Sequence, residues 1–265
     1  MSAREGAAAA TGAKKERLHT LDTLRGICII LMVVYHGFFD IWVFGLFPGS
    51  FVGELTEAAY SSAVLSALQN FFSGLFILIS GISCHLSRSN LKRGARLFAV
   101  AMGVTAATAL SGTGVVIIFG ILHFLSISML IFGLCDRFLP RLLAKVPALV
   151  WPALFIGALA LTKAVNPIEP VAVSAFGVRL GLPLFIFGFY SKGFFSADYF
   201  PLMPWLFLFF FGASLGRRLP KASDAPAIWR VRLPVVTAAG RHTLWIYLIH
   251  QPAILALLWL AERAL

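Results

Sequence analysis

Two histidines lie inside long apolar stretches of this chain, where polar side chains are rare. His36 lies within residues 27–47, and His123 lies within residues 115–135. An ionisable group is costly to bury at bilayer depth, so such a residue marks a candidate functional site. Asp40 follows His36 by one helical turn and shares its helix face. The pattern suits acid–base chemistry, with His36 as base or covalent carrier, Asp40 setting its tautomer, and His123 as partner or oxyanion donor.

The composition places these histidines in a membrane protein. Of the 265 residues, 59% are hydrophobic and 12% are charged, whereas soluble domains carry about 25% charged residues. Apolar stretches of about 20 residues are long enough to cross a bilayer. We therefore expect an all-α polytopic bundle. Its seven predicted spans are 24–46, 65–86, 95–111, 115–135, 147–165, 200–216 and 243–261.

The basic residues orient this bundle. The formal net charge of +11 comes from Lys and Arg gathered in short loops, which favours a membrane orientation over a nucleic-acid partner. With seven spans and a cytoplasmic N-terminus, all but four of the 22 Lys and Arg residues fall inside. We therefore expect residues 171–190 to be re-entrant or to lie at the outer face, with an eighth span as the alternative. Such a chain suits a bacterial inner (plasma) membrane.

The rest of the chain divides simply. Residues 1–20 contain no long apolar stretch and are predicted to be a disordered basic tail, so residues 21–265 form a single transmembrane domain. Three cysteines, Cys28, Cys84 and Cys135, match no metal-ligand spacing. We interpret them as small core residues and expect no metal.

A cluster of basic residues lies at the predicted cytoplasmic boundary. Arg25 lies near the start of the first span, and the next cytoplasmic loop contributes four more cations. Because arginine forks match phosphate oxygens, the cluster can bind an anion. Contact with lipid head groups is the alternative. The four loop residues are Arg88, Lys92, Arg93 and Arg96.

Four further residues are candidates for ligand binding. Asp198 and Trp205 lie at the predicted outer boundary, where a carboxylate can bind a sugar or an ammonium group; a solvated loop acid is the alternative. Tyr247 and His250 lie in the last span. Because Pro252 removes a backbone donor from this helix, His250 has an alternative role in satisfying the freed carbonyl.

Six motifs, in the same order, resemble the heparan-α-glucosaminide N-acetyltransferase catalytic-domain family. The resemblance covers about residues 17–260, and the family is similar to a wider group of transmembrane acyltransferases that begin with a D-x-x-RG helix bearing a histidine. The motifs are LDTLRGICIILMVVYHGFFD (21–40), FFSGLFILISGIS (71–83), LKRGARL (91–97), FGILHFLSIS (119–128), DYFPLMPWLFLFFFGASLGRRL (198–219) and GRHTLWIYLIHQP (240–252).

The resemblance implies transfer of an acetyl group from cytoplasmic acetyl-CoA to an amine or hydroxyl of a sugar or glycan at the outer side. His36 then matches the histidine of the opening motif, and the basic cluster is expected to hold the phosphates of CoA. The pantetheine arm would run along the bundle to His36, about 18 Å from the inner surface by helix rise. A transporter or flippase for a polar sugar or lipid is the alternative, and a structural subunit is a third. Membrane lipid is an expected partner, and a homo-oligomer remains open.

Overall fold

The structure is a computed structural model that describes residues 18–169, 172–175, 178–181, 183–220 and 224–264. Most of the predicted tail, residues 1–17, lies outside these ranges. The predicted boundary at residue 20 is slightly late, because the first helix already begins at His19. Nearly all of the secondary structure after this point is helical.

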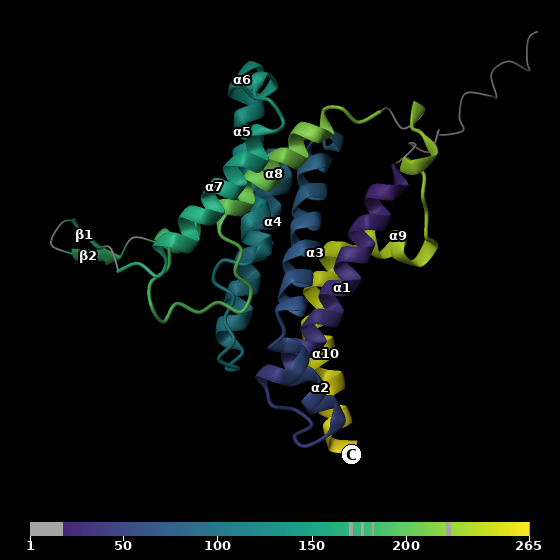
Figure 1. Cartoon of the computed structure of the whole chain (residues 1–265), viewed down its shortest axis with the longest axis vertical. Coiled ribbons are helices and arrows are strands. Elements are labelled where there is room, and N and C mark those ends of the chain that lie inside the picture. The colour runs from purple at the N-terminus through teal and green to yellow at the C-terminus, as the bar shows by residue number, and fades with distance from the viewer. Residues whose placement is uncertain (1–17, 170–171, 176–177, 182, 221–223, 265) are drawn as a thin grey trace, which may run out of the picture.

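Helices of very different lengths make up the chain (Figure 1). The described helices are α1 (His19–Val43), α2 (Phe51–Tyr60), α3 (Ala63–Ile82), α4 (Asn90–Leu110), α5 (Ile121–Phe138), α6 (Pro140–Lys145), α7 (Val150–Val165), α8 (Leu202–Gly216), α9 (Pro234–Arg241) and α10 (Thr243–Ala264). Short 3-10 turns lie at η1 (Ser83–Leu86), η2 (Leu184–Phe187) and η4 (Ala227–Trp229).

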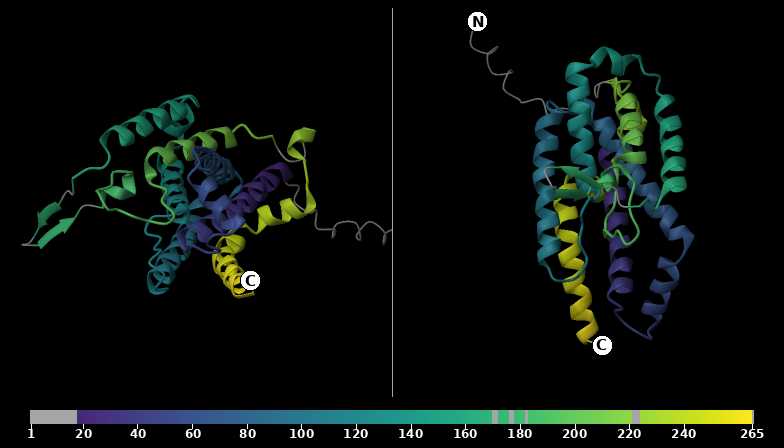
Figure 2. Two further views of the ribbon diagram at one scale, coloured as in Figure 1. Left: turned by 60° about the horizontal axis from the view of Figure 1, so that its bottom comes forward. Right: turned by 90° about the vertical axis from the view of Figure 1, so that its left-hand side faces the viewer.

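Long helices run along the longest axis of the molecule, and each predicted span corresponds to one helix (Figure 2). Within the described ranges, four helical segments are long and apolar enough to cross a membrane: α1, α3 with η1, α5 and α10. Helices α7 and α8 are apolar but shorter. The structure therefore supports a helical membrane protein, while the count of seven spans stays a prediction.

The segment 171–190 does not form an eighth long helix in its described part. Strand β1 (Ala172–Ala175) pairs antiparallel with β2 (Val178–Gly181), and the turn η2 follows. This hairpin projects from the helices (Figure 1), and it lies in the segment that the sequence set apart from the spans of the predicted all-α fold. Glycine at positions 177 and 181 and Pro183 disfavour a continuous helix in this segment.

The fourth predicted span begins later than expected. Residues 111–120 are not helical, and α5 begins at Ile121 rather than near Val115. Gly112 and Gly114 adopt positive φ angles of 70° and 75°, which glycine tolerates better than other residues. His123 therefore lies in the first turn of α5, directly after this non-helical segment, and its depth relative to His36 stays a prediction.

Helices α3 and α8 approach each other closely because two glycines face the partner backbone. A Cβ atom on Gly81 would lie 2.1 Å from the carbonyl oxygen of Phe209, and one on Gly212 would lie 2.1 Å from that of Leu78. Small residues allow helix backbones to pack closely in membranes, where dispersion contacts replace the hydrophobic drive. The crossing holds α8 against α3, and α3 forms one wall of the cavities described below.

This crossing predicts that Gly212→Ala destabilises the fold. Overpacking typically costs about 1–3 kcal/mol, so we expect the variant to unfold at lower temperature in detergent. Gly157→Ala is the matched control, because nothing lies within 4 Å of the position that its Cβ would take. Equal melting temperatures for both variants would contradict the proposed contact.

Candidate functional site

Four charged or titratable residues of α1 lie on one face of the helix. Asp22, Arg25, His36 and Asp40 are separated by 3, 11 and 4 residues, spacings that return to nearly the same side of a helix with 3.6 residues per turn. Arg25 and His36 are about 16 Å apart along the axis by helix rise. The helix therefore presents a cation near its N-terminal end and a histidine further along the same side.

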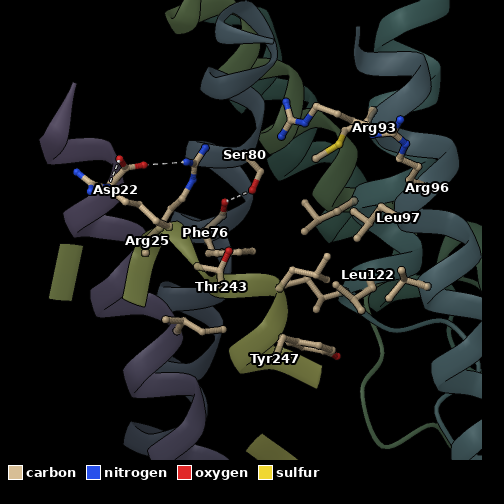
Figure 3. Close-up of a pocket in the computed structure, with 18 residues that line it drawn as sticks. Asp22, Arg25, Phe76, Ser80, Arg93, Arg96, Leu97, Leu122, Thr243 and Tyr247 are labelled. Atoms are coloured by element: carbon tan, nitrogen blue, oxygen red, sulfur yellow. Dashed lines mark hydrogen bonds and ion pairs between the residues drawn. The ribbon is translucent and has the colours of Figure 1, made fainter. Parts of the chain in front are cut away.

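A cavity of about 450 Å³ lies at the arginine end of this face. Arg25 enters it from α1, while Arg93 and Arg96 enter from α4 on the opposite side (Figure 3). Arg241 from α9 completes the set of four arginines in the lining. Farther from the arginines the wall becomes apolar, and Tyr247 lies at that end (Figure 3). A basic mouth with an apolar interior suits a ligand that has phosphates at one end and a slender chain at the other.

Asp22 ties two of these arginines together. Its carboxylate lies 3.3 Å from Nη1 of Arg25 and 3.5 Å from Nε of Arg241. Arg25 also donates from Nη2 to the hydroxyl of Ser83. Because these partners restrict the guanidinium groups, the positive charge at the cavity is held in place before a ligand arrives.

Two glycines allow Arg241 to reach Asp22. A Cβ atom on Gly26 of α1 would lie 1.8 Å from the carbonyl oxygen of Val236, and one on Gly240 of α9 would lie 1.7 Å from that of Asp22. Only glycine therefore fits at both positions where α1 crosses α9. This close crossing brings Arg241 beside the carboxylate of Asp22.

Only part of the predicted basic cluster lines the cavity. Arg88 and Lys92 are exposed and are not among the lining residues. Helix α4 begins at Asn90, and the hydroxyl of Ser89 caps it by accepting from the backbone of residue 92. From that start, Arg93 and Arg96 are three residues apart and share a face, while the other two cations point elsewhere. The basic cluster predicted from the sequence did not include Arg241. Gly240, directly before it, was a sign of a close helix crossing at this position.

A second cavity, of about 310 Å³, contains His36. Residues 28–38 of α1 and 65–76 of α3 form its long walls, and residues 197–200 close one side. Four residues line both cavities, so the two meet at one place. They are Ile29, Phe76, Ile121 and Tyr247.

The ring of His36 is oriented by its own helix and by a second histidine. Its Nδ1 lies 2.9 Å from the carbonyl oxygen of Met32. A carbonyl only accepts, so in the neutral ring Nδ1 carries the proton and Nε2 keeps its lone pair. The ring of His250 packs edge-on against it, with centroids 4.8 Å apart. His36 thus has the tautomer of a base.

Asp40 does not set this tautomer, contrary to the sequence-based expectation. It is 0% exposed, and its Oδ1 accepts a hydrogen bond of 2.5 Å from the amide of Gln251 in α10. The i and i+4 spacing places the carboxylate on the same face as His36, but the carbonyl of Met32 already occupies Nδ1. Asp40 instead links α1 to α10 one turn beyond the paired histidines.

His250 lies behind His36 and lines neither cavity. Its Nδ1 lies 2.6 Å from the carbonyl oxygen of Tyr247, and its Nε2 is buried with no partner among the described residues. In the structure this ring contacts the other histidine, and its contact with a substrate stays a prediction.

Asp198 connects three parts of the chain beside the second cavity. Its Oδ2 accepts hydrogen bonds of 2.8 Å from the backbone of Ile121 and of 2.8 Å from the hydroxyl of Tyr247. Gly120 makes room for this contact, because a Cβ atom there would lie 2.4 Å from the same oxygen. Burial raises the pKa of Asp198 above its ordinary value, and the two hydrogen bonds counteract part of that rise.

His123 and Trp205 lie outside both cavities. The Nε2 of His123 lies 3.2 Å from the hydroxyl of Thr105, and its ring stacks on Phe119. Among the described residues its ring packs against Phe98 and Phe119 and not against His36, and α5 begins two residues before it at Ile121. Trp205 packs against Phe155 and Phe200.

A helical membrane protein that joins a basic cavity to one bearing a histidine has the layout of a transferase working within a membrane. Residues 17–252 match the model of the catalytic domain of heparan-alpha-glucosaminide N-acetyltransferase. The match covers most of the chain, which therefore belongs to this family of membrane acetyltransferases. No curated protein and no solved structure matches it.

The pKa of Asp198 yields a prediction on pH. A carboxyl whose folded-state pKa is raised binds more protons in the folded state, so its contribution to stability is lost as pH rises from the unfolded pKa of about 3.9 towards the folded pKa. Asp198→Asn fixes a neutral side chain and should remove this loss. The stability of the wild type relative to the variant should therefore fall as pH rises above about 4.

Thermal unfolding in detergent across this pH range measures the difference. Glu54→Gln is the control, because Glu54 is an exposed carboxylate of α2. A constant difference between the wild type and Asp198→Asn at all pH values would contradict the shift.

Proposed function

We propose that the protein transfers an acetyl group from acetyl-CoA to an amine or hydroxyl of a sugar or glycan acceptor. The observation that carries this proposal is the meeting of the two cavities at Tyr247. Family membership supports the acetyl transfer. We further propose the identity of the donor, the class of the acceptor and the roles of individual residues.

The arginine cavity is the proposed donor site. Arg25, Arg93, Arg96 and Arg241 line it, and guanidinium forks match the oxygens of phosphate groups. The positive-inside rule supports a cytoplasmic location for this end. The pantetheine arm would follow the apolar wall towards Tyr247, and the distance of about 16 Å along α1 from Arg25 to His36 suits an extended arm.

His36 is the proposed general base. In a direct transfer, the acceptor nitrogen or oxygen attacks the thioester carbon while Nε2 of His36 takes the proton of the nucleophile. The tetrahedral intermediate then expels the CoA sulfur, which takes that proton and leaves as a thiol, so the imidazole returns to its neutral state. The carbonyl of Met32 keeps the required nitrogen free.

His250 and Asp198 are proposed positioning residues. The edge of the His250 ring limits rotation of His36, and Asp198 holds the hydroxyl of Tyr247 beside the meeting point of the cavities. Polar side chains of the second cavity, including Tyr35, Gln69 and Ser73, can donate to the oxyanion or bind acceptor hydroxyls.

The role of His36 is tested by a pair of isosteric substitutions. Glutamine cannot act as a base, so His36→Gln should lower kcat for acetyl transfer about 100-fold or more. His123→Gln is the matched control, because the amide can still contact Thr105 and the residue lies outside both cavities. It should retain kcat within severalfold.

Radiolabelled acetyl-CoA with a glucosaminide acceptor provides the measurement, and size-exclusion profiles verify that both variants fold. Full turnover by His36→Gln would refute the assignment of the base. Loss of turnover in His123→Gln alone would move the chemistry to α5.

The donor site is tested on α4, where two cations lie next to each other in sequence. Removing a charged hydrogen-bond donor costs about 1.5–3 kcal/mol, so Arg93→Ala should raise the Kd for acetyl-CoA about 10-fold to 100-fold. Lys92→Ala should leave the Kd unchanged, because Lys92 is exposed outside the cavity. Equal effects of both substitutions, measured by calorimetry at fixed ionic strength, would indicate general charge attraction and contradict a defined site.

A further inference from the structure

The second cavity has a part between α1 and α3 that is lined by apolar residues of both helices, and this part is called the groove. Three residues of each wall follow the spacing i, i+3 and i+7, which places them along one side of their helix. The wall from Leu31 to Phe38 is about 10 Å long by helix rise. The six residues are Leu31, Val34 and Phe38 on α1, and Leu65, Leu68 and Phe72 on α3.

The groove is open along the outer surface of both helices. Val34 and Leu68 line the cavity, yet they are 51% and 46% exposed. Both α1 and α3 are long and apolar enough to cross a membrane. Surface-exposed apolar residues on such helices face hydrocarbon, so this opening leads to lipid chains and not to water.

The polar groups of the same cavity lie on its other residues. Tyr35, His36, Gln69, Ser73 and Asp198 line it beside the apolar walls. A ligand that satisfies both parts has a polar head and an apolar tail. A free sugar would leave the apolar walls without a partner, and a simple hydrocarbon would leave the polar groups unsatisfied.

We propose that the acceptor is amphipathic, with its amine or hydroxyl at His36 and a hydrocarbon tail in the groove between α1 and α3. This inference rests on the proposed acetyl transfer and narrows its acceptor to a lipid-linked sugar or a similar molecule. The tail enters from the bilayer, so it stays in apolar surroundings while the head group reaches His36.

The first test compares hexyl and methyl glucosaminide as acceptors for protein in lipid nanodiscs. Each buried CH₂ group contributes about 0.8 kcal/mol, or about fourfold in affinity, so KM for the hexyl acceptor should be at least about tenfold lower. Leu68→Trp, which fills the groove, should raise the KM of the hexyl acceptor towards the methyl value. Leu257→Trp is the control, because Leu257 is an exposed position of α10 outside both cavities.

Equal KM values for the two acceptors in the wild type would overturn the groove assignment while the acetyl transfer itself stands. A second measurement does not depend on turnover: a glucosaminide with a diazirine in its alkyl tail should label residues 31–38 and 65–72 on irradiation, and excess hexyl glucosaminide should displace it. Labelling there without any acetyl transfer would support the groove and contradict the proposed function. Labelling elsewhere, or labelling that only phospholipid displaces, would overturn the groove as the acceptor site.

Discussion

The close crossing of α1 with α9 is the constraint on which the candidate site depends. Gly26 and Gly240 leave no space for a side chain between the two backbones, and the hydroxyls of Thr23 and Thr237 lie 2.8 Å apart beside them. The crossing fixes the position of α1 relative to α9. One face of α1 then places Arg25 at the arginine cavity and His36 in the second cavity. The crossing also explains why a distant segment near the C-terminus contributes to the basic cavity.

Much of the fold was accessible from composition and pattern alone. The length of each apolar stretch predicted a helix at each of the seven places, and the motifs predicted the family that the match confirms. The same-face spacing of Arg25 and His36 depends only on helical geometry, so their arrangement along α1 was predictable. Their roles in catalysis remain proposals.

Other features required tertiary contacts that no local pattern encodes. The partner of His36 is His250, more than 200 residues away, and the partner of Asp40 is Gln251. A same-face spacing suggested a pairing within α1, but a backbone carbonyl was the nearer acceptor. The start of α5 was misplaced because the apolar residues before Ile121 look like helix in a hydropathy pattern. Gly112 and Gly114 adopt positive φ angles within this segment, and the carboxylate of Asp198 accepts from the backbone N–H of Ile121, where the helix begins.

The boundary between the two cavities has a consequence for the membrane itself. Three of its four residues, Ile29, Phe76 and Ile121, are apolar, and the hydroxyl of the fourth, Tyr247, is held by a carboxylate. A passage between opposite sides of a bilayer would dissipate ion gradients if it filled with water. An apolar constriction disfavours a hydrated ion and accepts a slender organic chain. In the proposed mechanism, the boundary at these four residues is both the meeting point of two substrates and the barrier between two compartments.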